Sequence, residues 1–498
     1  MIRDWGMKGM ELIQRTKQGL RRYWLFLFVL ALGVIIWSLI FDSACSTFEG
    51  VRPYRAVWNG AGELPIFGYT VTYNFEGWAD YDYYYMSWAD QFLDGYLPYT
   101  EGFNHPTIDG TEYNTPYFFP PLYVYMCTFG RLLPIQPCGI GLVITVFGFI
   151  TVFPVYGIAE YLSSNRQVAV ISAATYLLNP LTLYYIAFEW LNPAPFIFFS
   201  LLGFLLLMKK KRLPGTLAIV TAALFKQTAF FFGLPLVAYL LKRAPEDPVP
   251  EIDETQEGRP PGDELDLLGF AGIVVVVVAF AAAVSLPYLP DIGNYFEYVF
   301  QRAGATYLRD LTVVPASNSP ITLAVPFISL GFPPWFIQGI NLVSYYSVGL
   351  VTGVIPLLAL MLLEEKDDRN LREYWRTILY LTLLLVLWLH IWSPRGIYKY
   401  YTVAILPFIS IMSSCGMCSK REEPVPLSLS MVVLPIGWSF LMLLPDRNIY
   451  ILYLLLTLLL YLLYRVGLGN VLVRLKAGLS TGAIKMRNRF RERYASFR

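Results

Sequence analysis

The chain has 498 residues, of which 56% are hydrophobic and only 15% are charged, and its formal net charge is +2. A soluble domain usually carries about 25% charged residues, so this composition excludes a soluble cytosolic enzyme, and the hydrophobicity excludes a disordered chain. The small net charge argues against a nucleic-acid-binding protein. Aromatic residues make up 16% of the chain, which suits a membrane protein with much interfacial surface.

Long apolar stretches divide most of the chain into candidate membrane-spanning helices. A spanning helix needs about 20 mostly apolar residues, and the sequence predicts an all-α polytopic membrane protein with about 10 full spans. The first span follows basic residues and lacks a small-residue cleavage pattern, so we interpret it as a retained signal anchor. The predicted windows are Trp24–Phe41, Gly139–Leu162, Val168–Tyr185, Phe196–Met208, Leu267–Leu286, Ile337–Leu363, Ile378–Trp392, Tyr401–Met417, Leu427–Leu444 and Ile449–Leu463.

Lys and Arg concentrate in short cytoplasmic loops, so their distribution predicts the side that each loop occupies. The N-terminal segment 1–23 and the tail 464–498 are both basic, which places both termini in the cytoplasm. The loop 43–119 carries ten acidic residues against two arginines, which places it outside or in a lumen. The stretch 24–463 is then one transmembrane domain. Its Pro-rich and acidic segment 244–266 is expected to be a disordered cytoplasmic loop.

The stretch 213–241 lies between two basic clusters that this orientation places on the same, cytoplasmic side. A single crossing would invert everything that follows, so we expect a broken hairpin of two half-length segments, covered by protein or a watery cavity. Lys226 is near its apex, 14 residues after Arg212, and a helix would carry it about 20 Å into the membrane. An ionisable residue at that depth is a functional candidate. Snorkelling towards water, or pairing with a buried carboxylate, is the alternative.

The outer loop contains an acidic and aromatic segment that predicts a short helix along the outer membrane interface. Apolar residues repeat at helical spacing between Asp82 and Leu93, and they are Tyr85, Trp88, Ala89 and Phe92. Gly95 is expected to end the helix. Asp80 and Asp82 stand at or just before its start. Asp82 is either an N-cap, which Asp favours, or a catalytic carboxylate at the membrane boundary, and the two roles are compatible.

Several segments of the chain carry a resemblance to a known family. The outer loop has Asp-Tyr at 82–83, then the amphipathic helix, Gly-x-x-Pro-Tyr at 95–99 and Tyr-Phe-Phe-Pro-Pro-Leu-Tyr at 117–123. This order resembles the first outer loop of GT-C glycosyltransferases, in particular the polyprenol-phosphate-mannose-dependent and GPI-type mannosyltransferases and their prokaryotic relatives. Shorter stretches at 223–235, 315–320 and 393–408 resemble the Lys-containing broken segment and later outer loops of the same enzymes.

The resemblance implies a GT-C-like bundle that transfers a sugar, such as mannose, from a polyprenyl-phosphate donor to a glycan, lipid or protein acceptor. It gives Asp82 the role of base, with Asp80 as the close competitor, and direct attack by the acceptor would invert the anomeric configuration. A leaving phosphate needs cationic partners, for which the candidates are Lys226, Arg395 and Lys399. Further candidates for substrate binding are Tyr83, Glu189, Arg309 and Tyr398.

No cofactor is predicted, because a chain with two His and no His-x-x-His offers few metal ligands. A divalent metal held by Asp80, Asp82 and Glu189 is the alternative. For Glu189 itself, an ordinary charge at the membrane interface is the favoured interpretation. The predicted partners are the polyprenyl-phosphate sugar, its acceptor and the membrane lipids.

Two other classes of function remain open on the sequence. A transporter or lipid flippase also has charged residues within its spans and broken helices. A non-catalytic subunit would keep the GT-C fold without the activity. The long acidic outer loop and the concentration of charged residues at the outer face favour the enzyme.

Three of the five cysteines lie on the predicted outer side of the membrane, and they are Cys45, Cys127 and Cys138. Two of them are candidates for a disulfide. The sequence does not decide which two.

Overall fold

The computed structural model describes residues 2–51, 60–66, 69–75, 78, 80–100, 103, 107–108, 111–112, 117–241, 266–302, 323–362, 371–392, 399–415, 425–443 and 453–459. In this part of the chain, five helices are long and apolar enough to cross a membrane: Arg22–Gly50, Gly139–Ser163, Arg166–Phe188, Leu267–Val284 and Tyr374–Trp392. Shorter apolar helices are Pro193–Met208, Arg212–Phe225, Gln227–Leu241, Gly349–Ala359 and Ser430–Leu443. The helical membrane class expected from the composition is therefore confirmed, while the total of about 10 full spans stays a prediction.

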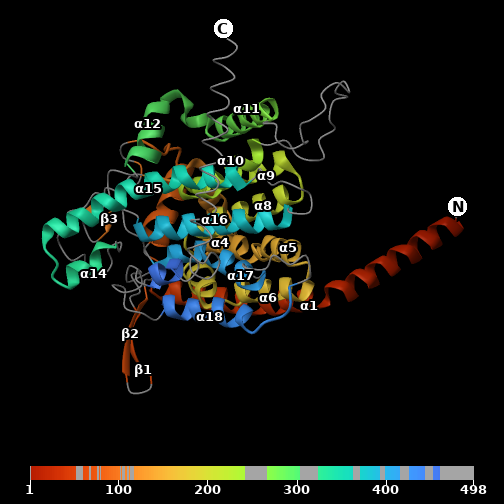
Figure 1. The fold of residues 1–498 in the computed structure, drawn as a ribbon. Helices are drawn as coiled ribbons and strands as arrows, with labels where there is room; N and C mark the ends of the chain where they lie inside the picture. Colours follow the sequence, from red (N-terminus) through yellow and green to blue (C-terminus); the bar gives the residue numbers. More distant parts are fainter. Residues whose placement is uncertain are drawn as a thin grey trace, which may run out of the picture.

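The main helices stack into one bundle (Figure 1). They are α1 (Ile2–Val51), α3 (Pro121–Arg131), α4 (Gly139–Ile150), α5 (Val152–Ser163), α6 (Arg166–Leu177), α8 (Pro193–Met208), α9 (Arg212–Phe225), α10 (Phe230–Leu241), α11 (Leu267–Val284), α15 (Pro334–Leu362), α16 (Leu371–Trp392), α17 (Leu406–Cys415) and α18 (Ser430–Leu443). Short elements between them are α7 (Pro180–Thr182), η3 (Leu183–Phe188), η4 (Gln227–Ala229), η5 (Leu286–Asp291), α12 (Ile292–Phe296), η6 (Glu297–Arg302), α14 (Ala324–Ser329) and η9 (Lys399–Ala404). Helix α8 packs on α9, α5 on α6 and α17, and α10 on α15 and α16.

The helix predicted within the loop 43–119 is present, in two parts, and its position at the outer membrane interface stays a prediction. The π-helix η2 (Tyr81–Met86) continues directly into α2 (Ser87–Leu93). The face expected to be apolar is the packed one, because Tyr85, Trp88 and Ala89 are buried. Gly95 follows with φ +90°, a left-handed conformation that glycine adopts without steric cost. The periodicity therefore predicted both the helix and its end correctly.

The outer loop also contains strands that an all-α expectation omits. Strand β1 (Gly60–Ile66) pairs antiparallel with β2 (Tyr69–Phe75), and β3 (Thr107–Ile108) pairs with β4 (Thr111–Glu112). The β2 sequence alternates aromatic or β-branched residues, a composition that fits a pleated strand. These two short hairpins lie within the predicted loop 43–119, and the all-α class of the bundle stands.

Helices α9 and α10 form the two arms of a hairpin. Arg212, at the start of α9, donates from Nη2 to the carbonyl of Leu240 at the end of α10, at 2.6 Å. Arg212 also forms an ion pair with Asp266, at 3.1 Å, and Asp266 caps α11. The arms meet at Lys226, whose extended backbone (φ −153°, ψ 128°) breaks the helix. Residues 242–265, which include all of the predicted cytoplasmic loop 244–266 except Asp266, lie outside the described part.

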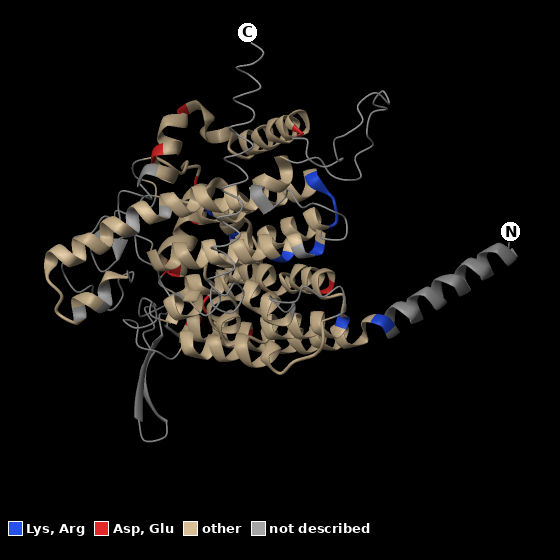
Figure 2. Cartoon of the chain, in the orientation of Figure 1, with Lys and Arg blue, Asp and Glu red and all other residues tan. Residues whose placement is uncertain are grey.

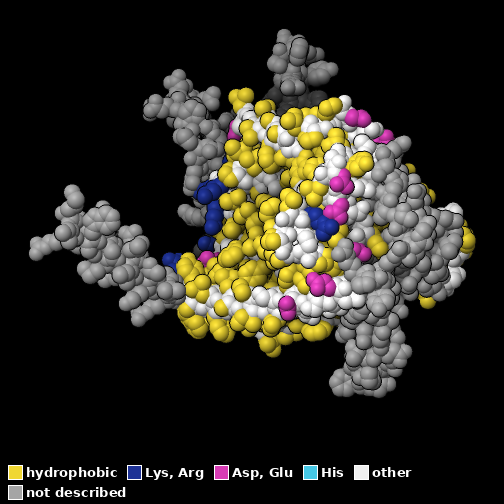
Figure 3. All heavy atoms as spheres, turned by 180° about the vertical axis from the view of Figure 1, so that it is seen from behind, with side chains coloured by type: hydrophobic (Ala, Val, Ile, Leu, Met, Phe, Trp, Pro, Cys, Tyr) yellow, Lys and Arg dark blue, Asp and Glu magenta, His cyan; other side chains and the backbone are white. Residues whose placement is uncertain are grey.

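Hydrophobic side chains cover much of the described surface, as Figure 3 shows for one face. Helix α11 has no buried residue along its length, and Leu268 is 89% exposed. Helix α15 exposes Trp335, Tyr346 and Leu350. An apolar patch of this extent is costly in water and suits contact with lipid.

Close packing near the outer loop predicts a large effect of a small substitution. A Cβ placed on Gly141 would lie 2.4 Å from the buried Trp190 ring, whereas one on Gly349 would meet nothing within 4 Å. We expect Gly141→Ala to destabilise the protein by about 1–3 kcal/mol, because a packed ring cannot move aside cheaply. Thermal unfolding in detergent measures this, with Gly349→Ala as the matched control. Equal unfolding temperatures for the two variants would contradict the packing described.

Candidate functional site

Lys226 is buried at the apex of the hairpin. It is only 4% exposed, and its Nζ donates a hydrogen bond to Oδ1 of Asn192. The ammonium group lies 4.2 Å from the ring centroid of Tyr401, and three further rings surround it: Phe119 at 5.4 Å, Phe196 at 5.8 Å and Tyr400 at 6.0 Å. Ring faces attract a cation, an effect that is strongest away from water. The site is thus built to hold a positive charge at the end of a helix.

Asn192 connects Lys226 to two tyrosines. Its Nδ2 donates to the hydroxyl of Tyr85 at 3.1 Å and, over a longer 3.5 Å, to that of Tyr400. Asn192 is 2% exposed and directly precedes α8. The turn before it is strained, because Trp190 has φ +56°, a conformation that costs a bulky residue about 1–3 kcal/mol. Buried ring contacts with Tyr81, at 4.8 Å, hold Trp190 in this turn.

Asp80 joins the same network from the outer loop. The Tyr400 hydroxyl donates to Oδ2 of Asp80 at 3.4 Å, so the contacts run from Lys226 through Asn192 and Tyr400 to Asp80. We call these four residues, with Tyr85, the polar network. It joins η2, the start of α8, the apex of the hairpin and η9, which are far apart in the sequence. Burial, and secondarily the Asp80 carboxylate, raises the pKa of Tyr85 well above its usual value, so this hydroxyl keeps its proton.

The outer loop touches the hairpin apex at a second place. Gln227 donates from Nε2 to the carbonyl of Phe118 at 2.9 Å. The Tyr99 hydroxyl donates to the carbonyl of Phe119 at 2.7 Å. The segments 95–99, 117–123 and 223–235, which carry the resemblance described above, therefore lie together in space.

Asp82 is placed differently from Asp80. It is the second residue of η2, half-buried, and its backbone N–H donates to the carbonyl of Trp78 at 2.9 Å. The N-cap position belongs to Asp80, which makes no side-chain cap hydrogen bond. The N-cap interpretation of Asp82 was therefore wrong, because the helix begins one residue earlier than the periodicity suggested. Tyr83 follows it and is half-buried.

Glu189 is fully buried rather than an ordinary interfacial charge. Its side chain is 0% exposed, and Oε1 accepts a hydrogen bond from the Tyr184 hydroxyl. Tyr184 lies in the π-helical turn η3, and Glu189 directly follows this turn. The apolar residues around Glu189 in the sequence therefore indicate burial in the bundle and not a position at the membrane interface. Among the residues described, no three His, Cys, Asp or Glu side chains gather as metal ligands would. Asp80, Asp82 and Glu189 are therefore not grouped around a metal position.

The other predicted site residues lie mostly outside the described part. Arg309, Arg395 and Tyr398 are not described, and of Lys399 only the backbone is described, at the start of η9. His390 is buried beside this segment. Its Nδ1 contacts the Val386 carbonyl at 2.6 Å, and its Nε2 contacts the Tyr401 carbonyl at 3.1 Å. The second contact holds the backbone of Tyr401, whose ring lies beside the Lys226 ammonium group.

Sequence reasoning missed Asn192, Tyr85, Tyr400 and Tyr401 as members of the site. A polar Asn directly before a Pro is typical of an ordinary helix start, so Asn192 carries no functional signal of its own. The sequence contains 36 tyrosines, and nothing in it distinguished these three from the others. One feature of the sequence could have identified two of them, because Tyr400 and Tyr401 belong to the late segment 393–408 that carried part of the family resemblance.

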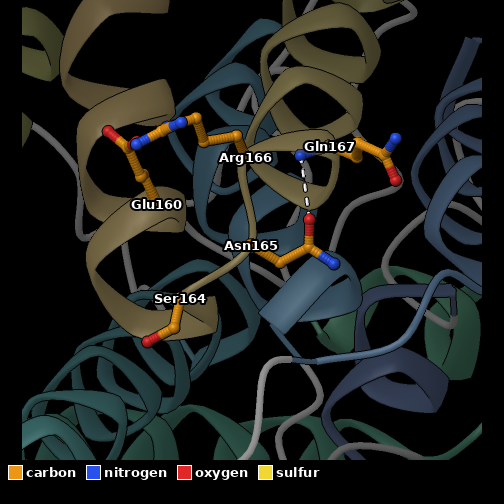
Figure 4. Close-up of a pocket in the computed structure, with 5 residues that line it drawn as sticks. All are labelled: Glu160, Ser164, Asn165, Arg166 and Gln167. Carbon is orange, nitrogen blue, oxygen red and sulfur yellow. Dashed lines mark hydrogen bonds and ion pairs between the residues drawn. The ribbon is translucent and has the colours of Figure 1, made fainter. Parts of the chain in front are cut away.

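A cavity of about 560 Å³ lies at the turn between α5 and α6, and Figure 4 shows the residues that line it. It is lined by Glu160, Ser164, Asn165, Arg166 and Gln167. The chain runs from this cavity through α6, α7 and η3 to Glu189 and Asn192, so these elements separate the cavity from the polar network.

Comparison of the chain with models of known protein families gives no match, and a search of curated proteins gives no relative.

Proposed function

We propose that the protein is a membrane glycosyltransferase with a GT-C-like fold, which moves a sugar such as mannose from a polyprenyl-phosphate donor to a lipid-linked, glycan or protein acceptor. The observation that carries the proposal is the polar network, because it joins a carboxylate and a buried ammonium group at one end of a helical bundle. A sugar-phosphate reaction needs both: a base for the attacking hydroxyl and a positive charge for the leaving phosphate.

The orientation of the network is argued from charge. Lys and Arg gather at one side of the bundle, at the turn between α8 and α9, at the start of α6 and on α1 where it reaches the bundle (Figure 2). Basic loops favour the cytoplasmic side. Lys226 is 14 residues along α9 from Arg212, so it lies about 20 Å from that side. We infer that the polar network opens towards the outer or lumenal face, where a lipid-linked donor keeps its chain in the bilayer.

The proposed chemistry assigns a task to each described residue. Asp80 takes the proton from the acceptor hydroxyl, which attacks the anomeric carbon as the bond to phosphate breaks, so the configuration inverts. Lys226 stabilises the charge that develops on the leaving phosphate. Asn192 holds the ammonium group in position. Asp82 is the alternative base, and Arg395 and Lys399 stay candidates for binding the donor phosphate. The candidates for substrate binding stay Tyr83, Glu189, Arg309 and Tyr398.

Transfer by the purified protein tests this function. The full chain in lipid nanodiscs would be given radiolabelled polyprenyl-phosphate mannose or glucose together with a membrane lipid extract as acceptor. We expect label to move to the acceptor, with wild-type protein and not with a Lys226→Met, Asp80→Asn double variant. Movement of the lipid across proteoliposomes without any transfer would instead identify a flippase and reject the proposal.

The hairpin makes its own topological prediction. We expect Lys209→Cys and Lys242→Cys to react with a membrane-impermeant maleimide only from the cytoplasmic side, because both flank the same hairpin. Thr100→Cys, in the exposed outer loop, is the control and should react only from the outside. Opposite accessibility of positions 209 and 242 would mean that this stretch crosses the membrane, which contradicts the proposed depth of Lys226.

A further inference from the structure

Two cysteines from distant segments meet beside the outer loop. Cys45 lies near the end of α1, and Cys138 directly precedes α4, 93 residues later. The side chains of Cys45 and Cys138 are neighbours, and both thiols are free in this structure. Cys138 is 3% exposed and Cys45 is half-buried. The two thiol groups therefore face each other in a packed environment.

Independent packing holds the two segments in this arrangement. Phe48, one helical turn after Cys45, packs edge-on against the Tyr81 ring at 5.2 Å. The Tyr81 hydroxyl donates to the carbonyl of Pro137 at 2.7 Å and accepts from the Gly141 backbone N–H at 3.1 Å. Both segments that carry a cysteine thus pack against the buried Tyr81. The two segments are therefore held close together by contacts other than those of the thiols.

We propose that Cys45 and Cys138 form a disulfide in the mature protein. The bond would close a loop that contains the whole outer segment with Asp80 and Asp82, and it would tie the end of α1 to the start of α4. The inference rests on the proposed orientation, because disulfides persist in oxidising outer compartments. It does not rest on sugar transfer.

The reaction is a thiol–disulfide exchange with an oxidised dithiol protein of the outer compartment. The thiolate of one cysteine attacks the disulfide of the oxidant, which releases one oxidant thiolate and gives a mixed disulfide. The second cysteine of the chain then attacks the mixed disulfide and releases the other oxidant thiolate. Two electrons and two protons pass from Cys45 and Cys138 to the oxidant, which leaves as a dithiol.

Differential labelling of the full chain tests the bond. Cells would be lysed in a denaturant that contains light N-ethylmaleimide, so that buried free thiols also react, and the purified protein would then be reduced and labelled with the heavy reagent before peptide mass spectrometry. We expect heavy label on Cys45 and Cys138 and light label on Cys127, and a linked Cys45–Cys138 peptide in the unreduced digest. Light label on both cysteines, or a link from either one to Cys127, would overturn the inference.

Thermal unfolding gives a second readout that is separate from transfer activity. A phosphine reductant should lower the unfolding temperature of wild-type protein by several degrees, because the closed loop is long. The Cys45→Ser, Cys138→Ser double variant should start at the lower temperature and not respond to reductant, whereas Cys127→Ser should respond as wild type does. A wild-type protein that ignores the reductant would contradict the disulfide, whether or not the protein transfers sugar.

Discussion

Replacing Lys226 by Met should reduce sugar transfer by about 100-fold to 1,000-fold, the loss typical of removing one group that stabilises developing negative charge. The Met side chain fills the space between the rings of Phe119, Phe196, Tyr400 and Tyr401 without a charge. The readout is the initial rate of label transfer from the polyprenyl-phosphate donor. Thermal unfolding should change by only a few degrees, because an apolar residue suits this surrounding.

A matched lysine separates the local effect from a general loss of positive charge. Lys211 is exposed at the basic end of the bundle, and Lys211→Met should keep wild-type transfer. Asn192→Ala should lower the rate less than Lys226→Met does, because it removes the hydrogen bond and leaves the charge. Wild-type rates in Lys226→Met would remove the cationic centre from the proposed reaction.

Asp80→Asn should reduce transfer by about 100-fold or more, the range of a lost general base, whereas Asp82→Asn should reduce it by less than tenfold. The amide keeps the shape of the carboxylate and can still meet the Tyr400 hydroxyl, 3.4 Å from Oδ2 in the wild type. Asp80 is joined to Lys226 through the polar network, and this is the reason for the different expectations. The measurement compares the rates of both variants at saturating donor.

Each aspartate serves as the control for the other, because Asp80 is the N-cap residue of the interface helix and Asp82 lies in its first turn. Both variants should unfold at similar temperatures. A larger loss in Asp82→Asn would return the role of base to Asp82, as the family resemblance implies. Full activity in both would remove the carboxylate base from the mechanism.

The parts of this fold that the sequence predicted are those governed by local patterns. The interface helix followed from the spacing of Tyr85, Trp88 and Ala89, and Gly95 marked its end because of its conformational freedom. The hairpin was inferred from two basic clusters and a lysine between them. Its arms indeed return to the same end, as the contact between Arg212 and the Leu240 carbonyl shows.

The polar network could not be predicted in the same way, because its partners come from four separate elements. Nothing local to Asn192 indicates that Lys226 and Tyr85 will reach it, since burial and tertiary contact decide this. Glu189 illustrates the reverse error. Its position after a span suggested water and lipid headgroups, but the π-helical turn η3 carries it into the core, where Tyr184 provides a hydrogen bond.

A structure of the protein in nanodiscs with a polyprenyl phosphate would test the central claim most directly. We predict density for the lipid phosphate within contact distance of Lys226, on the side of the network that Asp80 faces, with the lipid chain leaving along the apolar surface of the bundle. Density for the phosphate at the basic side of the bundle, beside the cavity at the α5–α6 turn, would contradict the assignment of Lys226 and Asp80 to the reacting centre.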